Sequence, residues 1–347
     1  MTVSISALRG FLLEEALSKL LENSGYTLIN KDVLKYPEEY PEFVSQGNGL
    51  NIKGRGGTHQ ADVLGQFSIS IPFNYPVRLF LEAKFRNKKA GIEVVRSGIG
   101  ILTDLNANYQ TISLDNDELL VQRFNYQYAI FSTSGFSENA IRLAIAYKIT
   151  LIDLSGIEYR DLLLTIDSVA HRLRDLLFFD RITLSDVREY IRHKLFNINI
   201  DDYLKYTFNF DDVLRPLLCK IKSYKDLYLA SINSPFSILL KPSFPEEFRD
   251  FLRDCRESTF EVSIRWHDDN PDLWEIFLYG FSGEKFTFYL PELISRHVFN
   301  NPKDPNVVVN ALNAKEQFFS SMVFYMKSAE KFITFKYRKS MITNDKK

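Results

Sequence analysis

The sequence between residues 126 and 154 restricts the possible folds more than any other part of the chain. Residues 126–133 read as a β-strand, and Ser137 is suited to cap a helix over 138–148. A further short apolar run follows at 149–154. A strand, a helix and a second strand in this order predict a βαβ crossover, in which the two strands run parallel.

The residues before this crossover predict the remainder of one α/β domain. Apolar side chains at helical spacing indicate helices over 8–23 and 91–108. Two β-rich runs, 61–71 and 77–85, flank a segment with two prolines and an asparagine, so we expect them to form a hairpin. The stretch 36–57 is rich in Pro, Glu, Asn and Gly and is interpreted as a long loop. Together these segments predict a mixed sheet flanked by helices.

The second half of the chain has a different pattern. From residue 157 to about 231 the apolar residues follow helical spacing, whereas from 236 onward aromatic and β-branched segments are broken by turns. We therefore expect an α/β domain over 1–158, a helical linker over 159–234 and a β-rich α+β domain over 235–347.

Composition excludes several classes of protein. The chain has 43 Lys and Arg residues against 44 Asp and Glu residues, so its overall charge does not favour a nucleic-acid or membrane partner. Its two cysteines, Cys219 and Cys255, are too few for a disulfide scaffold or a four-cysteine zinc site. No run of about 18 apolar residues is present, so we expect no membrane span and a cytoplasmic protein.

Three charged residues in the predicted hairpin carry the chemistry. If the hairpin reverses at 73–74, antiparallel pairing places Asp62 opposite position 84 or 86, on the order of 7 Å from Glu82 and Lys84. Glu82 and Lys84 are two positions apart and project from the same face of the strand. Two carboxylates and one ammonium group are therefore expected to converge.

Such a cluster suits the hydrolysis of a phosphodiester bond. Two carboxylates, a backbone carbonyl and water molecules form an oxygen-rich site of the kind that Mg²⁺ accepts, and the metal polarises the phosphodiester. Lys84 would orient or deprotonate the attacking water, or neutralise charge in the transition state. The alternative is a pair of ordinary strand-end carboxylates, one of them in a surface ion pair with Lys84. The apolar run Leu79-Phe80-Leu81 before Glu82 favours the metal site, because a buried charge needs a partner.

Four segments resemble the PD-(D/E)xK nucleases, and within them the Mrr-like restriction endonuclease group. They are GRGGTHQADVLG, LFLEAKF, GIEVVRSGIGIL and FSTSGFSENAIRLAIAYKITLIDLSG, and the resemblance spans about residues 8 to 158. It implies a restriction-endonuclease-like sheet and metal-dependent cleavage of DNA. The catalytic residues would be Asp62, Glu82 and Lys84.

The resemblance also implies the ligands of the metal, which would be Mg²⁺ or Mn²⁺. Asp62, Glu82 and the backbone carbonyl of Ala83 would bind the ion. Glu14 matches the acidic position of the family's first helix, with Glu15 as its neighbour and rival.

A local excess of basic residues surrounds the acidic cluster. Between residues 53 and 96 there are eight Lys and Arg residues against three acidic residues, which suits a polyanionic substrate. The alternative is a solvated face without a partner. The candidate DNA-binding residues are Arg55, His59, Gln60, Arg86, Lys88, Arg96 and Ser134.

The sequence thus predicts a magnesium-dependent endonuclease for restriction of foreign or phage DNA. We expect a homodimer, because one such site cuts one strand, and no membrane partner. The β-rich domain is expected to recognise a target, a protein partner or a trigger. The alternatives are a noncatalytic DNA- or partner-binding module on a nuclease fold and a repair or recombination nuclease for branched DNA.

Overall fold

A computed structural model describes residues 3–339 except 47–48, 71, 115–116, 122, 157–158, 180–182, 201–210, 234–236, 268–269, 282–284 and 300–305. The chain divides into two compact units. The first contains Met1–Glu22, Tyr26–Leu143 and Asp153–Lys225, and the second contains Asn23–Gly25, Ala144–Ile152 and Asp226–Lys347. In the part of the chain described here, no helix is both long enough and apolar enough to cross a membrane.

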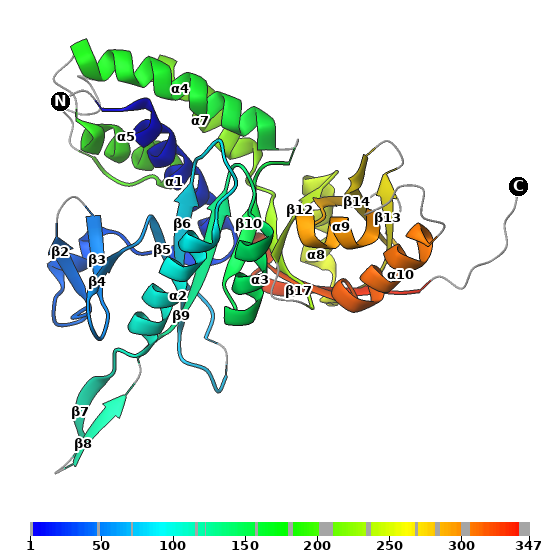
Figure 1. Ribbon diagram of the computed structural model, residues 1–347, viewed down its shortest axis with the longest axis horizontal. Helices are drawn as coiled ribbons and strands as arrows, with labels where there is room; N and C mark the ends of the chain where they lie inside the picture. The colour runs from blue at the N-terminus through cyan, green and yellow to red at the C-terminus, as the bar shows by residue number, and fades with distance from the viewer. Residues whose placement is uncertain are drawn as a thin grey trace, which may run out of the picture. The chain divides into compact units, whose positions relative to one another are not determined.

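A five-stranded sheet forms the centre of the N-terminal unit, although most of its edge strand Thr150–Asp153 belongs to the second unit (Figure 1). Its strand order is β1-β5-β6-β9-β10, with bounds Tyr26–Leu28, Val63–Phe67, Val77–Lys84, Asn125–Ser132 and Thr150–Asp153. β5 pairs with β6 antiparallel and β6 pairs with β9 parallel, so the predicted mixed sheet is confirmed.

Helices precede and connect these strands as the sequence predicted. α1 (Ile5–Asn23) opens the chain, α2 (Ile92–Asn106) connects β6 to β9, and α3 (Glu138–Tyr147) connects β9 to β10. β9 and β10 are neighbours in the sheet, as a crossover through α3 requires. The first five residues of β6 and most of β9 are buried, which explains the apolar runs Leu79-Phe80-Leu81 and Ala129-Ile130-Phe131 in their sequences.

The register of the β5–β6 hairpin differs from the prediction. Val63 pairs with Leu81 and Leu64 with Phe80, so continuation of the ladder sets Asp62 beside Glu82 and not opposite position 84 or 86. The hairpin is centred earlier in the chain than 73–74, so the predicted pairing is wrong by at least two residues. A shift by two residues keeps every side chain on the same face, so Asp62 still approaches the Glu82 side of β6.

Two strands of a second, three-stranded sheet lie within the stretch 36–57 that the sequence analysis interpreted as a long loop, and the third strand follows it. β2 (Phe43–Gln46), β3 (Gly49–Lys53) and β4 (Thr58–Gln60) are paired antiparallel. The loop prediction for 36–57 is therefore wrong over these strands. The polar composition of the stretch concealed two buried apolar positions, Phe43 and Ile52, which are paired with each other across β2 and β3.

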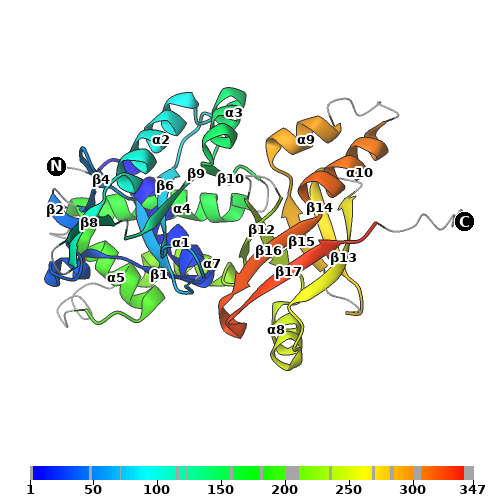
Figure 2. The same ribbon diagram turned by 90° about the horizontal axis from the view of Figure 1, so that it is seen from below.

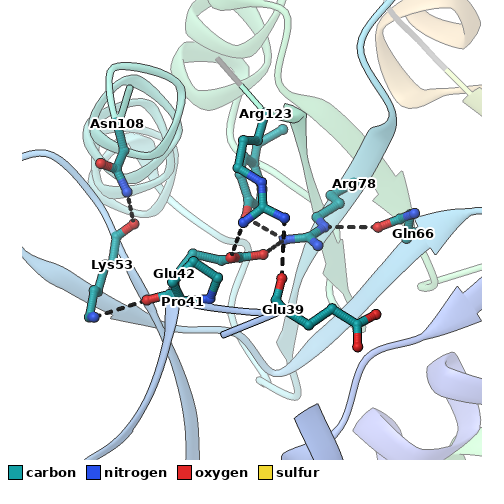
Figure 3. Close-up of polar contacts among 9 residues, drawn as sticks. Glu39, Pro41, Glu42, Lys53, Gln66, Arg78, Asn108 and Arg123 are labelled. Carbon is teal, nitrogen blue, oxygen red and sulfur yellow. Dashed lines mark hydrogen bonds and ion pairs between the residues drawn. The ribbon is translucent and has the colours of Figure 1, made fainter. Parts of the chain in front are cut away.

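An ion pair between Arg78 and Glu42 connects this small sheet to the central sheet (Figure 3). Arg78 Nη1 donates to Glu42 Oε1 at 2.6 Å, and Arg78 Nε donates to Gln66 Oε1 at 3.1 Å. Arg123 donates to the other Glu42 oxygen at 3.2 Å. The Arg78 guanidinium also stacks on the Phe124 ring, with Cζ 3.2 Å from the ring centroid. Arg78 and Glu42 are both buried, so each charge depends on the other for compensation.

Further elements of the N-terminal unit were predicted only in part. β7 (Gln110–Leu114) and β8 (Asp117–Val121) form a two-stranded hairpin that projects from the unit and was not predicted (Figure 1). The predicted helical segment contains α4 (Arg160–Phe179), α5 (Leu184–Phe196) and α7 (Asp211–Ser223).

These three helices belong to the N-terminal unit, whereas the sequence analysis had set them apart as a linker over 159–234. Ion pairs connect α4 and α5 to α1. Arg9 pairs with Asp167, and Arg188 pairs with Glu14 at 2.9 Å. The last change from the first unit to the second along the chain lies after residue 225.

The C-terminal unit is built on a closed barrel, which agrees with the predicted β-rich region (Figure 2). The order is β11-β12-β15-β14-β13-β17-β16, with bounds Tyr228–Ser231, Ser237–Pro242, Lys285–Tyr289, Asn270–Leu278, Thr259–His267, Lys331–Tyr337 and Ser321–Met326. The helices of this unit are α8 (Pro245–Asp254), α9 (Glu292–Phe299) and α10 (Val307–Phe318). Aromatic side chains such as Trp274, Phe286 and Phe335 are fully buried and form its core.

Candidate active site

Asp62 lies directly before β5, against the end of β6. Its Oδ2 accepts a hydrogen bond from the backbone N–H of Ala83 at 2.7 Å. Burial raises the pKa of Asp62 above its usual value, although the hydrogen bond from Ala83 and the positive charge of Lys84 act in the opposite direction. The carboxylate is therefore positioned by the backbone of the strand that carries the other two predicted residues.

Glu82 and Lys84 project from the same face of β6 and form an ion pair. The second Glu82 oxygen accepts a hydrogen bond from the hydroxyl of Tyr128, on β9. The side chains of Glu82 and Lys84 are 18% and 21% exposed, so the pair is accessible but largely enclosed. The three residues predicted as catalytic thus lie together at one end of the β5–β6 pair.

Tyr128 is a site residue that the sequence analysis did not identify. Its ring stacks on Phe80 with centroids 5.0 Å apart, and burial and the Glu82 charge raise the pKa of its phenol. Gly98 on α2 lies against the same ring, where a Cβ atom would be 2.8 Å from Tyr128 Cε1. A glycine is therefore required at this close approach of α2 to β9.

Glu14 comes to the cluster from α1. Burial, followed by the negative charge of Asp62, raises the pKa of Glu14 to about 7. Arg188 of α5 opposes this shift and donates to Glu14 Oε2 at 2.9 Å. Glu15, the rival candidate, is fully buried and pairs with Arg188 and Arg192, so Glu14 is the acidic residue of α1 that interacts with Asp62.

The chemistry of these donors fits a hard divalent cation. Carboxylate oxygens and a backbone carbonyl are the ligands that Mg²⁺ and Mn²⁺ accept. Burial first, and then a neighbouring carboxylate, raise the pKa values of Glu14 and Asp62, so a positive charge at this site would stabilise their ionised forms. Over the residues that the structure describes, no group of three or more His, Cys, Asp or Glu side chains is arranged to hold a metal ion. The carboxylates of Glu82 and Glu14 are instead paired with the chain's own cations, Lys84 and Arg188.

The glycine-rich loop 54–57 is held by Asp104, near the end of α2. Two glycine N–H groups of this loop donate to the Asp104 carboxylate at 2.7 and 3.2 Å. His59 Nε2 lies 2.7 Å from Asp104 Oδ2, and this contact holds the pKa of Asp104 below its usual value. The loop is therefore a fixed structure that presents Arg55, whose side chain is exposed.

The other predicted DNA-binding residues lie on several elements. Gln60 is exposed in β4, and Arg96 is exposed on α2. Arg86 and Lys88 are exposed in the segment between β6 and α2. Ser134 donates its hydroxyl to the carbonyl of Lys88 at 2.6 Å, so it fixes this segment from the end of β9.

No family model matches this chain, and no curated protein matches it. One solved structure to which it is similar is described as the crystal structure of a protein of unknown function, AF1548. The two are 16% identical, and the match covers 62% of this chain and 97% of that chain with a TM-score of 0.32. A TM-score of this size supports no inference about fold or function.

Proposed function

We propose that the chain is a metal-dependent DNA endonuclease of the PD-(D/E)xK type, with a restriction-endonuclease-like sheet and closest in kind to the Mrr-like group. The observation that carries the proposal is the convergence of Asp62, Glu82 and Lys84 at one end of β5 and β6. Asp62 and Glu82 are carboxylates in a largely enclosed site beside a lysine, which is the set of groups that metal-assisted phosphodiester hydrolysis requires.

Asp62, Glu82, the Ala83 carbonyl and Glu14 would hold Mg²⁺ or Mn²⁺. When bound, the ion polarises the scissile phosphodiester and stabilises charge on the leaving oxygen. Lys84 orients the attacking water and places a positive charge beside the phosphate. Tyr128 keeps the Glu82 carboxylate in position through its hydrogen bond. Lys84 and Tyr128 both contact the Glu82 carboxylate. To act on the substrate, the Lys84 ammonium group has to break its ion pair with Glu82 and reorient toward the phosphate.

The surroundings of the cluster support a polyanionic substrate. Arg86 and Lys88 are exposed in the segment that follows Lys84, and Arg96 on α2 and Arg55 in the loop 54–57 are exposed as well. Basic contacts of this kind supply most of the nonspecific affinity for DNA. We propose that foreign DNA such as a phage genome is the substrate, and that two copies of the chain make a double-strand cut. The barrel unit would recognise the target, a protein partner or a trigger.

The test is cleavage of supercoiled plasmid, phage and branched DNA with Mg²⁺, Mn²⁺ or EDTA. Lys84→Ala is compared with Lys241→Ala, a matched change at an exposed lysine of β12. We expect metal-dependent cutting by the wild type and by Lys241→Ala, and a loss of at least about a hundredfold in Lys84→Ala. Cutting restricted to branched DNA would favour a repair nuclease. Equal cutting by Lys84→Ala would exclude the proposed site.

A further inference from the structure

The interface between α1 and α5 is a cluster of two acids and two arginines beside the candidate active site. Arg188 and Arg192 are four residues apart on α5, so they lie on the same face of the helix. Arg192 Nε donates to Glu15 Oε2 at 3.0 Å. Arg188 lies between the two acids, with Nη2 2.9 Å from Glu14 and Nε 3.1 Å from Glu15.

The contacts of Arg188 with the two acids are of different quality. Its contact with Glu14 is an aligned hydrogen bond, whereas Arg188 Nε and Glu15 Oε1 are within ion-pair distance but have no aligned hydrogen bond. Glu15 has Arg192 as a second, hydrogen-bonded partner. The strongest contact of Arg188 is therefore the one with the proposed metal ligand.

Arg188 also acts on the rest of the acidic site. The pKa values of Glu14 and Asp62 are raised overall, and the positive charge of Arg188 partly offsets both shifts. The guanidinium is therefore close enough to interact with both carboxylates. A fixed positive charge in that position repels a divalent cation approaching the same oxygens. Arg188 comes from a helix outside the segment of the chain in which the sequence placed the nuclease domain.

We propose that Arg188 is a competing cation, which holds the Glu14 carboxylate in place of a divalent metal ion and has to leave it before the metal binds. This inference rests on the proposed function, because it assumes that Glu14 is a metal ligand. It deepens that function by assigning to α5 a control of metal affinity. A chain that lacks the Arg188 charge binds the metal more tightly than the wild type.

Isothermal titration calorimetry with Mn²⁺ and with Mg²⁺, at fixed pH and without DNA, tests the inference. The variants are Arg188→Gln and, as the matched control, Arg192→Gln, whose ion pair is with Glu15 and not with Glu14. We expect Arg188→Gln to bind Mn²⁺ about tenfold more tightly, as the removal of one neighbouring charge predicts, and Arg192→Gln to be unchanged within about threefold. Arg188→Lys, which keeps the charge, should remain close to the wild type.

A double-mutant cycle with Glu14→Gln shows whether the effect passes through Glu14. In the Glu14→Gln background, Arg188→Gln should increase the affinity clearly less than the roughly tenfold expected with Glu14 present, because only the repulsion between Arg188 and the cation remains. Circular dichroism confirms that each variant is folded. Equal or weaker metal binding by Arg188→Gln would overturn the inference, because Arg188 would then be neutral or would position Glu14 as a ligand. Absence of binding by the wild type and every variant would instead refute the proposed metal site, and with it both proposals.

Discussion

Replacement of Glu14 by glutamine should stabilise the protein at neutral and alkaline pH. The pKa of Glu14 rises from its ordinary value of 4.5 to about 7 on folding, with burial as the largest cause and Asp62 next. An acid whose pKa is higher in the folded state binds more protons there than in the unfolded chain. The free energy of unfolding therefore falls as the pH rises from 4.5 to about 7.

The size of the effect follows from the shift. At about 1.4 kcal/mol per pH unit, the ionised Glu14 costs up to about 3 kcal/mol above pH 7 in the absence of metal. The side chain is 21% exposed, so solvent screening is limited. Glutamine has no charge to bury, and Glu14→Gln should gain most of this free energy at about pH 8 and almost none at about pH 4.

Urea unfolding followed by circular dichroism, at several pH values in EDTA, measures the difference. Tryptophan fluorescence is unsuitable, because Trp266 and Trp274 both lie in the C-terminal unit. Glu138→Gln, a change at an exposed glutamate of α3, is the control and should stay within about 0.5 kcal/mol of the wild type. A Glu14→Gln variant that is less stable than the wild type at pH 8, or that keeps the same pH dependence, would refute the reasoning.

Three further substitutions test the packing around the site. Arg78→Met removes the buried partner of the Glu42 carboxylate and leaves it with the half-buried Arg123, so it should lower the free energy of unfolding by about 3 kcal/mol, which chemical denaturation would show. Tyr128→Phe removes the hydroxyl that donates to Glu82 and should reduce the cleavage rate about tenfold, with DNA affinity measured by anisotropy unchanged. Asp104→Ala frees the loop 54–57 and should weaken DNA binding about threefold to tenfold, while Asp104→Asn should lose less. Unchanged unfolding of Arg78→Met would contradict the first expectation, and an unchanged cleavage rate of Tyr128→Phe the second. Unchanged DNA affinity of Asp104→Ala would contradict the third.

Much of the central sheet could be predicted because its elements have strong local patterns. β6 and β9 each contain an apolar run of three residues, 79–81 and 129–131, and α2 has apolar residues at regular helical intervals. The small sheet could not be predicted, because β2, β3 and β4 are short and one of its contacts, the ion pair of Glu42, is with the distant Arg78. Local sequence does not contain that information.

The same limit applies to the site. The proximity of Asp62, Glu82 and Lys84 follows from a hairpin register, and an error of two residues in that register did not change the face on which they lie. Tyr128 had a weak signal, as a residue with a polar group in a buried strand. Arg188 had none, because it is 174 positions from Glu14 and meets it only through the packing of α5 on α1.

The ion pair between Arg78 and Glu42 has a consequence for ligand binding. Arg78 belongs to β6, the strand that ends in Glu82 and Lys84, whereas Glu42 immediately precedes the small sheet whose strands β3 and β4 flank the loop 54–57. The ion pair thus joins the sheet that carries the loop to the strand that carries Glu82 and Lys84. A loop that is already ordered loses little conformational entropy when it binds a ligand. The distance between the loop 54–57 and the acidic cluster would then be the same before and after binding. If the proposed nuclease function holds, a DNA backbone bound at Arg55 would present the same phosphodiester bond to Lys84 in every complex, so the cut would fall at a fixed distance from the bound phosphate.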